Sequence, residues 1–175
     1  GSANATYSTT AALVYVVTAY IFFPQIPLNH GMMRKIEIIA PVGSVVNAEF
    51  PSPVSAMATT TFDIVAACIM GAFSKIVPDR VIAASYNLQS FVTSGYDPRN
   101  ESEFVTYSWG PGGWGASNTV DGRVSMALYT NTTTNIPCEA EERRIPFIIE
   151  EYAIVADSGG AGRRRGGDSA GYLIG

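Results

Sequence analysis

The stretch that most constrains this chain is a run of glycine and arginine between Asp157 and Asp168. It holds five glycines and three consecutive arginines, Arg163 to Arg165. Glycine permits positive φ and close approach of the backbone to another surface, so this segment must turn sharply or lie against something. Arginine carries a planar fork suited to carboxylate or phosphate. We therefore weigh two interpretations, an anion-binding loop and a tight turn whose arginines pair with the acidic residues Glu139, Glu141, Glu142, Glu150 and Glu151.

A second glycine block, residues 110–116, looks like a companion of the first and is followed by Asp121 and Gly122. We expect at least one of Gly112, Gly113 and Gly115 to have a positive φ, because tight glycine turns commonly use that region. Trp114 is expected to form the wall of a pocket or an anchor at an interface, since a tryptophan gains most when its ring is buried.

The bulk composition excludes several classes of protein. Only 15% of the residues are charged while 47% are hydrophobic, which indicates that part of the surface is buried against a partner. A net charge of −4 and a pI near 4.9 argue against nucleic-acid binding. Two cysteines are too few for a disulfide scaffold, and we expect a cytoplasmic protein. The single histidine, His30, has no companions at ligand spacing, so no metal site is expected in this chain.

The first 33 residues contain no charged side chain, and the apolar run 11–23 is shorter than the ~20 residues that a membrane span needs. We predict a helix over 7–23, buried between layers or against another subunit, because its apolar residues surround the axis. A second, amphipathic helix is predicted over 60–76, with Thr59 or Thr60 as its N-cap. Alternating patterns predict strands over 35–40, 80–85, 103–109, 123–130 and 145–156. The expected fold class is α+β, with two main helices, mostly antiparallel strands and one domain over 1–175.

Several stretches together resemble the C-terminal part of the hydantoinase B/oxoprolinase family, and they occur in the order in which the family has them. These are residues 26–31 with Arg34, 40–44, 111–116 with 121–122, Asn131 with 135–137 and Glu139, and 157–162 with 165–167. The resemblance implies a C-terminal fragment or split subunit of a larger hydantoinase-B-like fold. Family members are several times longer, and their metal-binding Asp and His residues lie upstream of the part seen here.

This resemblance implies a subunit of a multi-subunit, ATP-dependent enzyme that is not active alone. We favour a carboxylase of the acetophenone or acetone carboxylase type, which carboxylates a phosphate-activated ketone enolate. The alternatives are a cyclic-amide hydrolase of the hydantoinase or oxoprolinase type and a non-catalytic scaffold subunit. No cofactor is expected on this chain itself. ATP with Mg²⁺ and a divalent metal are expected in the partner parts, namely the upstream hydantoinase-B-like part and a hydantoinase-A-like subunit that uses ATP.

Both reactions develop negative charge on oxygen, which preorganised N–H donors and arginine stabilise. The candidate catalytic residues are Asn29, His30 and Asp121. The candidate substrate- or anion-binding residues are Gly112, Gly113, Trp114, Gly115, Arg163 and Arg164. Arg165 is expected to be the most buried of the three arginines and to form a structural ion pair with Asp157, with Glu139 as another partner.

Overall fold

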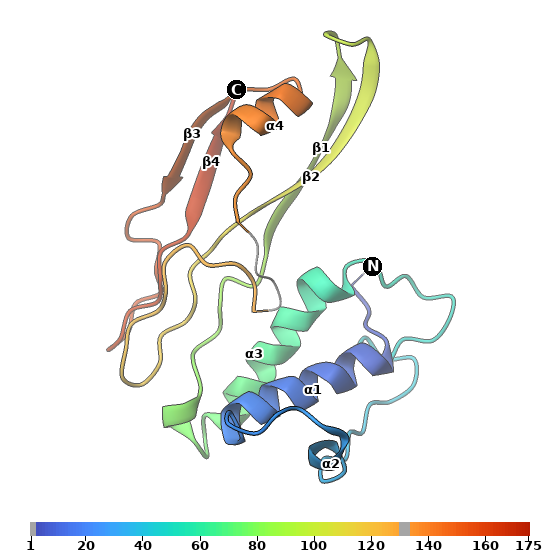
Figure 1. The fold of residues 1–175 in the computed structure, drawn as a ribbon, viewed down its shortest axis with the longest axis vertical. Helices are drawn as coiled ribbons and strands as arrows, with labels where there is room; N and C mark the ends of the chain where they lie inside the picture. Colours follow the sequence, from blue (N-terminus) through green and yellow to red (C-terminus); the bar gives the residue numbers. More distant parts are fainter. Residues whose placement is uncertain (1–2, 130–133) are drawn as a thin grey trace.

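The computed structural model describes residues 3–129 and 134–175 and confirms the α+β class. The molecule is elongated: α1, α2 and α3 lie at one end, and two narrow two-stranded sheets extend toward the other end, where α4 lies (Figure 1). Most of the glycines lie in two loops, residues 111–122 and residues 157–169. The C-terminus lies at the sheet end of the molecule, and the N-terminal segment lies beside the helices.

The helical end is built on α1 (Tyr7–Phe22) and α3 (Phe62–Phe73), which pack against each other. The predicted first helix is confirmed to within one residue. The Thr6 side chain caps its N-terminus by accepting a hydrogen bond from the backbone N–H of Thr9. The two helices bury a small apolar core made of Leu13, Val17, Ile21, Ala66 and Val81.

The second predicted helix is also present, with different ends. A π-helical turn, Met57–Thr61, precedes α3, so the caps predicted at Thr59 and Thr60 lie inside this turn. Thr61 occupies the N-cap position, and its side chain makes no capping hydrogen bond. Its hydroxyl instead donates to the carbonyl of Ala3. The α3 helix ends at Phe73, where the ring meets Phe22 edge-on with centroids 4.9 Å apart.

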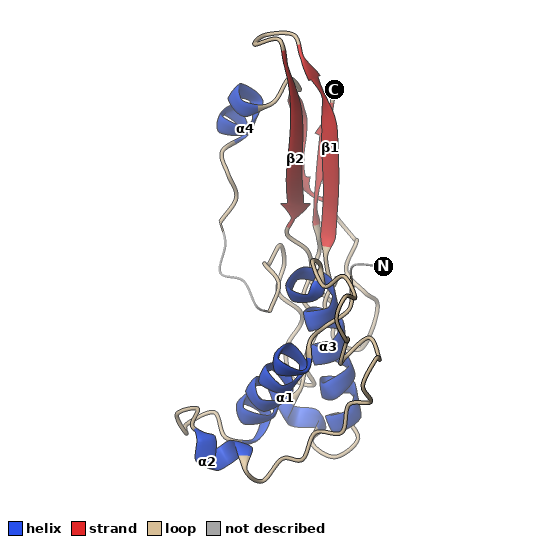
Figure 2. Cartoon of the chain, turned by 90° about the vertical axis from the view of Figure 1, so that its right-hand side faces the viewer, coloured by secondary structure: helices blue, strands red, loops and turns tan. Residues whose placement is uncertain are grey.

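The longest strands, β1 (Gln89–Asp97) and β2 (Ser102–Gly110), form an antiparallel hairpin that projects from the rest of the molecule (Figure 2). The pairing runs without a shift from Gln89 opposite Gly110 to Asp97 opposite Ser102. The buried carboxylate of Asp97 accepts the guanidinium of Arg99 at 2.9 Å and closes the turn. The sequence predicted β2 but not β1, whose residues are mostly small or polar.

A second antiparallel pair lies beside the hairpin and consists of β3 (Ile149–Ile154) and β4 (Ala170–Ile174). Tyr152 and Tyr172 face each other across it and stack with centroids 4.3 Å apart. The short helix α4 (Cys138–Arg144) precedes β3. The strand predicted over 145–156 therefore begins later and ends earlier than expected.

Three other predicted strands are absent from the described residues. Residues 35–40 are irregular, residues 80–85 contribute a single bridge from Ile82 to Ser117, and residues 123–129 contribute one from Met126 to Gly112. Thr130, the last residue of that predicted strand, lies outside the described residues. The short elements α2 (His30–Met33) and the 3-10 turn Pro78–Arg80 complete the fold. Residues 80–85 and 123–129 pair only at isolated points, and residues 35–40 have no bridge within the described residues, so no ladder forms.

The accessible surface is large for the size of the chain. It measures 10983 Å², whereas a compact monomer of 18.6 kDa exposes about 8,200 Å². Much of the excess is apolar, because side chains such as Phe50, Ile39 and Val105 are 95%, 85% and 77% exposed. Across residues 3–129 and 134–175, no helix combines the length and hydropathy that crossing a bilayer requires.

Candidate functional site

The two glycine-rich stretches lie against each other between the helices and the sheets. The backbone N–H of Gly167 donates to Trp114 at 3.0 Å, and that of Gly122 donates to Arg165 at 2.7 Å. A further bond joins Trp114 N–H to the carbonyl of Arg123 at 2.9 Å. We call this unit the glycine cradle, defined as residues 111–116, 121–126 and 157–169.

Close contact with other segments explains most of the glycines of the cradle, although Gly160 has open space around it. A Cβ on Gly113 would lie 1.6 Å from the carbonyl oxygen of Gly167, and one on Gly115 would lie 2.1 Å from that of Ala83. A Cβ on Gly112 would lie 2.0 Å from the ring of Tyr86. The expectation of a positive φ in this block is wrong, because Gly43 is the only glycine with a positive φ among the described residues. The missing Cβ, and not the φ angle, is what the cradle requires.

The cradle borders an open cavity of about 310 Å³. Ser85 and Tyr86 line one side of it, and Trp114, Gly115, Gly160 and Arg164 are among the other lining residues. Trp114 is half-buried and also borders the apolar groove along α1, as expected for the wall of a pocket. Its indole N–H donates to the carbonyl of Ala127 at 2.7 Å.

Most of the N–H groups proposed as donors are already used. Gly112 donates to Met126, Gly113 to the Ser169 hydroxyl and Trp114 to Arg123. Among the cavity-lining residues, the N–H groups of Gly115, Gly160 and Ala161 make no hydrogen bond within the described part of the chain. Available donors therefore come from both loops.

The three arginines occupy different environments, although all three are exposed. Arg163 donates to the Asn118 side chain at 2.6 Å. Arg165 forms the predicted ion pair with Asp157, but the side chains are 46% and 86% exposed, so the pair lies at the surface and is not buried. Such exposed pairs contribute about 0–1 kcal/mol. Arg164 lines the cavity and has no hydrogen bond or ion pair within the described ranges.

None of the arginines pairs with the acidic residues between 139 and 151 in the described structure, where Glu141 instead pairs with Arg144. Asp121, a candidate catalytic residue, is exposed and accepts the backbone N–H of Arg165 at 3.0 Å. This hydrogen bond joins the two loops of the cradle.

The candidates Asn29 and His30 lie elsewhere, at α2. Asn29 caps this short helix by accepting the backbone N–H of Gly31 at 2.9 Å. It also borders an apolar groove of about 420 Å³ beside α1. His30 is exposed at the first position of α2. Neither residue lines the cavity of the cradle, so the structure brings the two glycine loops together without them.

Sequence reasoning missed a buried polar cluster behind the cradle. Asp63, in the first turn of α3, is fully buried, and the Ser85 hydroxyl donates to its Oδ2 at 3.4 Å. Burial raises the pKa of Asp63 to about 6 and, together with the neighbouring Asp63 charge, that of Tyr86 to about 12. The Oδ1 atom of Asp63, the Tyr86 hydroxyl and the Asn87 side-chain oxygen are buried without partners in the described structure. The available signal in the sequence is a lone acid on an apolar helix face.

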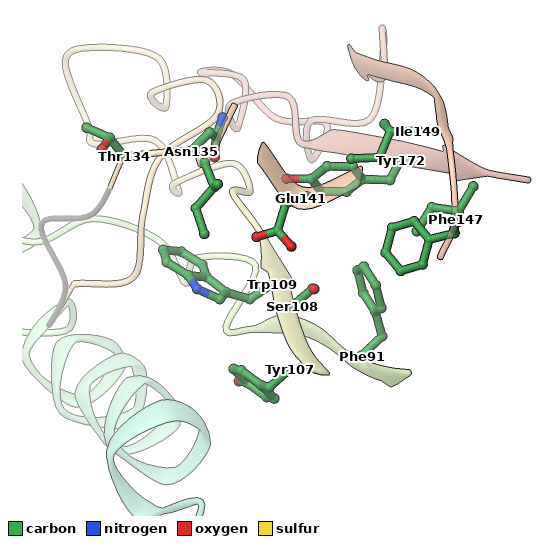
Figure 3. A pocket seen from close by; sticks show the side chains of 12 residues that line it. Phe91, Tyr107, Ser108, Trp109, Thr134, Asn135, Glu141, Phe147, Ile149 and Tyr172 are labelled. Atoms are coloured by element: carbon green, nitrogen blue, oxygen red, sulfur yellow. The ribbon is translucent and has the colours of Figure 1, made fainter. Parts of the chain in front are cut away.

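A second pocket, about 80 Å³, lies between the two sheets and α4 (Figure 3). Its walls are largely aromatic and include Phe91, Trp109, Phe147 and Tyr172. Burial raises the pKa of Tyr172 well above its usual range. The polar residues that line this pocket include Asn135 and Glu141. The Asn135 amide donates to the Tyr152 hydroxyl. Asn131, which belongs to the same stretch of the family resemblance, lies outside the described residues.

The described residues do not fit a metal centre, because no group of three His, Cys, Asp or Glu side chains among them could hold an ion. The chemistry that this part of the molecule offers is hydrogen bonding and positive charge at the cavity. Both would favour an anionic ligand or a reacting oxygen on which negative charge develops.

Comparison with known proteins identifies relatives over nearly the whole chain. The chain is 34% identical over 164 residues to one component of a putative D-/L-hydantoinase from a Pseudomonas species, covering 93% of this chain and 26% of that protein. It is 30% identical over 160 residues to the beta component of the caprolactamase of Pseudomonas jessenii, covering 87% of this chain and 28% of that protein. The chain thus spans about a quarter of the length of these relatives.

The fold matches a solved structure of acetone carboxylase, from a study of ATP-dependent acetone carboxylation, with a TM-score of 0.80. That match is 20% identical and covers 99% of this chain and 24% of the other chain. The hydantoinase B/oxoprolinase family profile matches residues 1–174. The chain therefore belongs to the hydantoinase B/oxoprolinase family.

Proposed function

We propose that this chain is part of a hydantoinase-B-like subunit of a cytoplasmic, multi-subunit enzyme that hydrolyses a cyclic amide in an ATP-dependent reaction. The observation that carries the proposal is the meeting of both glycine loops at one cavity lined by Arg164. Relatives at 30% identity or more are named after hydantoin and caprolactam, which are cyclic amides. We therefore rank hydrolysis above the carboxylation that the sequence analysis favours.

In this proposal the cradle binds the oxygen on which negative charge develops. Opening a cyclic amide with water breaks the C–N bond, puts the new oxygen on the carbonyl carbon and leaves a proton on the released nitrogen. The carbonyl oxygen, or a phosphate attached to it, is the most negative group along this path. The Arg164 guanidinium and the unused N–H groups of Gly115 and Gly160 are the donors available to it.

Carboxylation of a phosphate-activated ketone enolate is the second candidate, favoured by the structural match to acetone carboxylase. An enolate phosphate and bicarbonate are also anions, so the same donors suit both reactions. A hydantoinase-A-like partner would use ATP with Mg²⁺ to form the phosphate. The upstream part of the family fold would hold the divalent metal, since the described residues offer no ligand set for it.

The test uses the full-length subunit assembled with its ATP-using partner. Hydantoin, 5-oxoproline and caprolactam are each supplied with ATP, and acetone and acetophenone with ATP and bicarbonate, while ring opening, carboxylation and phosphate release are followed. Turnover of a cyclic amide supports the first candidate, and carboxylation without ring opening supports the second. Activity that is unchanged when residues of the cradle are altered would leave this part of the chain a scaffold.

The matched variants are Arg164→Ala and Arg143→Ala. Loss of one charge-assisted hydrogen bond costs about 1.5–3 kcal/mol, so we expect kcat/KM to fall roughly 10- to 100-fold in Arg164→Ala. Arg143 is exposed on α4 and does not line the cavity, so its replacement controls for loss of a surface charge. Equal activity of the two variants would remove Arg164 from the site.

A further inference from the structure

Asp63 is buried without a positive partner. Its side chain is fully buried in the first turn of α3, and none of the ion pairs within the described residues includes it. Its Oδ1 atom has no hydrogen-bond partner in the described structure, and Oδ2 lies 3.4 Å from the Ser85 hydroxyl. A buried carboxylate that lacks a cation is costly, so this environment favours the protonated acid.

Ser85, which donates a hydrogen bond to Asp63, also lines the cavity of the cradle. Ser85 and Tyr86 border that cavity, and the backbone N–H of Tyr86 donates to the carbonyl of Gly113 at 3.1 Å. The Ser85 oxygen in turn accepts the N–H of Asn87 at 3.2 Å. Asp63 is thus connected to the wall of the cavity through the Ser85 hydroxyl.

We infer that Asp63 controls anion binding in the glycine cradle, so that the cradle takes up an anion together with one proton, which resides on Asp63. This inference rests on the proposed anion-binding role of the cradle. An ionised Asp63 would repel an anion in the cavity and would hold the Ser85 hydroxyl as a donor to itself. A protonated Asp63 can donate to the Ser85 oxygen, which leaves the Ser85 hydroxyl proton for the anion.

The neighbours of Asp63 do not change their charge in the relevant pH range. Tyr86 and Tyr129 are the titratable side chains that interact electrostatically with it, and burial raises the pKa of both above the usual tyrosine value of 10.0. Both therefore stay neutral below pH 8. Arg164, which also lines the cavity, stays positive because the arginine pKa exceeds 12. Asp63 is the group at this wall whose charge changes between pH 5 and pH 8.

The experiment measures sulfate binding to the assembled enzyme by calorimetry at several pH values. Sulfate serves as the probe because its charge is constant between pH 5 and pH 8. We expect its Kd to rise at least about tenfold over this range, which corresponds to about 1.4 kcal/mol. Near pH 7, titrations in buffers of different ionisation enthalpy should reveal the uptake of protons on sulfate binding, up to one proton for each sulfate bound.

Three variants locate the effect. Asp63→Asn keeps the shape of the neutral acid, so its sulfate affinity should be independent of pH and its binding should take up no proton. Glu103→Gln removes an exposed carboxylate on β2 and should behave like the wild type. Arg164→Ala should weaken sulfate binding at every pH, which places the bound ion in the cradle.

Two results would overturn the inference while leaving the cradle intact. One is sulfate binding that depends on Arg164 but not on pH, and the other is proton uptake that persists in Asp63→Asn. Absence of sulfate binding at all pH values would reject the anion-binding cradle as well. If Asp63→Asn does not fold, infrared spectra of the wild type with labelled aspartate decide: sulfate must increase the absorption of the protonated acid near neutral pH.

Discussion

At the scale of single residues, the cradle depends on glycines that contact other backbone segments. A Cβ on Gly113 would lie 1.6 Å from the Gly167 oxygen, and the nearby backbone is held by several hydrogen bonds. Relief of this overlap requires the two loops to separate. The contact therefore couples the shape of one loop to that of the other.

We predict that Gly113→Ala lowers the free energy of unfolding of the assembled enzyme by about 1–3 kcal/mol or more, because overpacking displaces the backbone. Gly160→Ala is the matched control, since nothing lies within 4 Å of its added Cβ. That control should change stability by less than about 0.5 kcal/mol. Chemical denaturation measures both variants, and similar losses in the two would show that the loops do not pack as described.

At the scale of elements, α3 connects the helical core to the cradle. Its apolar face packs on α1 through Ala66 and through the ring of Phe73. Its first turn carries Asp63, which bonds to Ser85 on the wall of the cavity. The same helix therefore contributes both to stability and to the properties of the site.

The position of Asp63 on α3 predicts a pH-dependent stability. Its folded pKa of about 6 exceeds its ordinary value of 3.8, so protonation stabilises the folded state. The contribution of Asp63 to the free energy of unfolding is fully present below pH 4 and is lost as the pH rises through 6. A shift of this size corresponds to roughly 3 kcal/mol.

The measurement is the difference in unfolding free energy between wild type and Asp63→Asn, without added anions. We expect the advantage of the wild type to fall by about 2–3 kcal/mol between pH 4 and pH 7. The subtraction removes the contribution of Asp97, whose pKa is lowered by Arg99 and whose effect has the opposite sign. A difference that is constant with pH would mean that Asp63 is ionised in the folded protein throughout.

At the scale of the whole molecule, the surface exposes a large apolar area. The apolar helix α1 is bordered by open grooves of about 630 and 420 Å³, and Tyr20 on this helix is 71% exposed. The total accessible surface exceeds that of a compact monomer by more than about 2,000 Å². Contiguous apolar patches of several hundred Å² usually mark interfaces.

We predict that residues 1–175 expressed alone aggregate and bind a hydrophobic dye, and that co-expression of the remaining parts of the enzyme relieves both effects. Covering even 400 Å² of apolar surface contributes about 10 kcal/mol at 25 cal/mol per Å². Size-exclusion chromatography and dye fluorescence give the readout. A monomer that unfolds cooperatively and binds no dye would reject this interpretation.

The amino-acid sequence alone determined the elements whose pattern is local. The apolar run of α1, the helical spacing of α3 and the alternation in β2 each specify an element without reference to distant residues. The ordered glycine motifs likewise identified the family, which the match over residues 1–174 confirms. The sequence also indicated that the glycines mark close contacts, but not which backbone each one meets.

Only the tertiary structure decided where distant segments meet. The strand β1 exists because β2 pairs with it over nine residues, although its own pattern is weak, while the apolar segment 35–40 finds no such partner in the described structure. Burial of Asp63 depends on segments that come from far along the chain, and so does the exposure of Arg165. The periodicity of the sequence indicates which side of an element is apolar. The burial of a side chain, its pKa and its contacts with the backbone depend on which other parts of the chain cover that side.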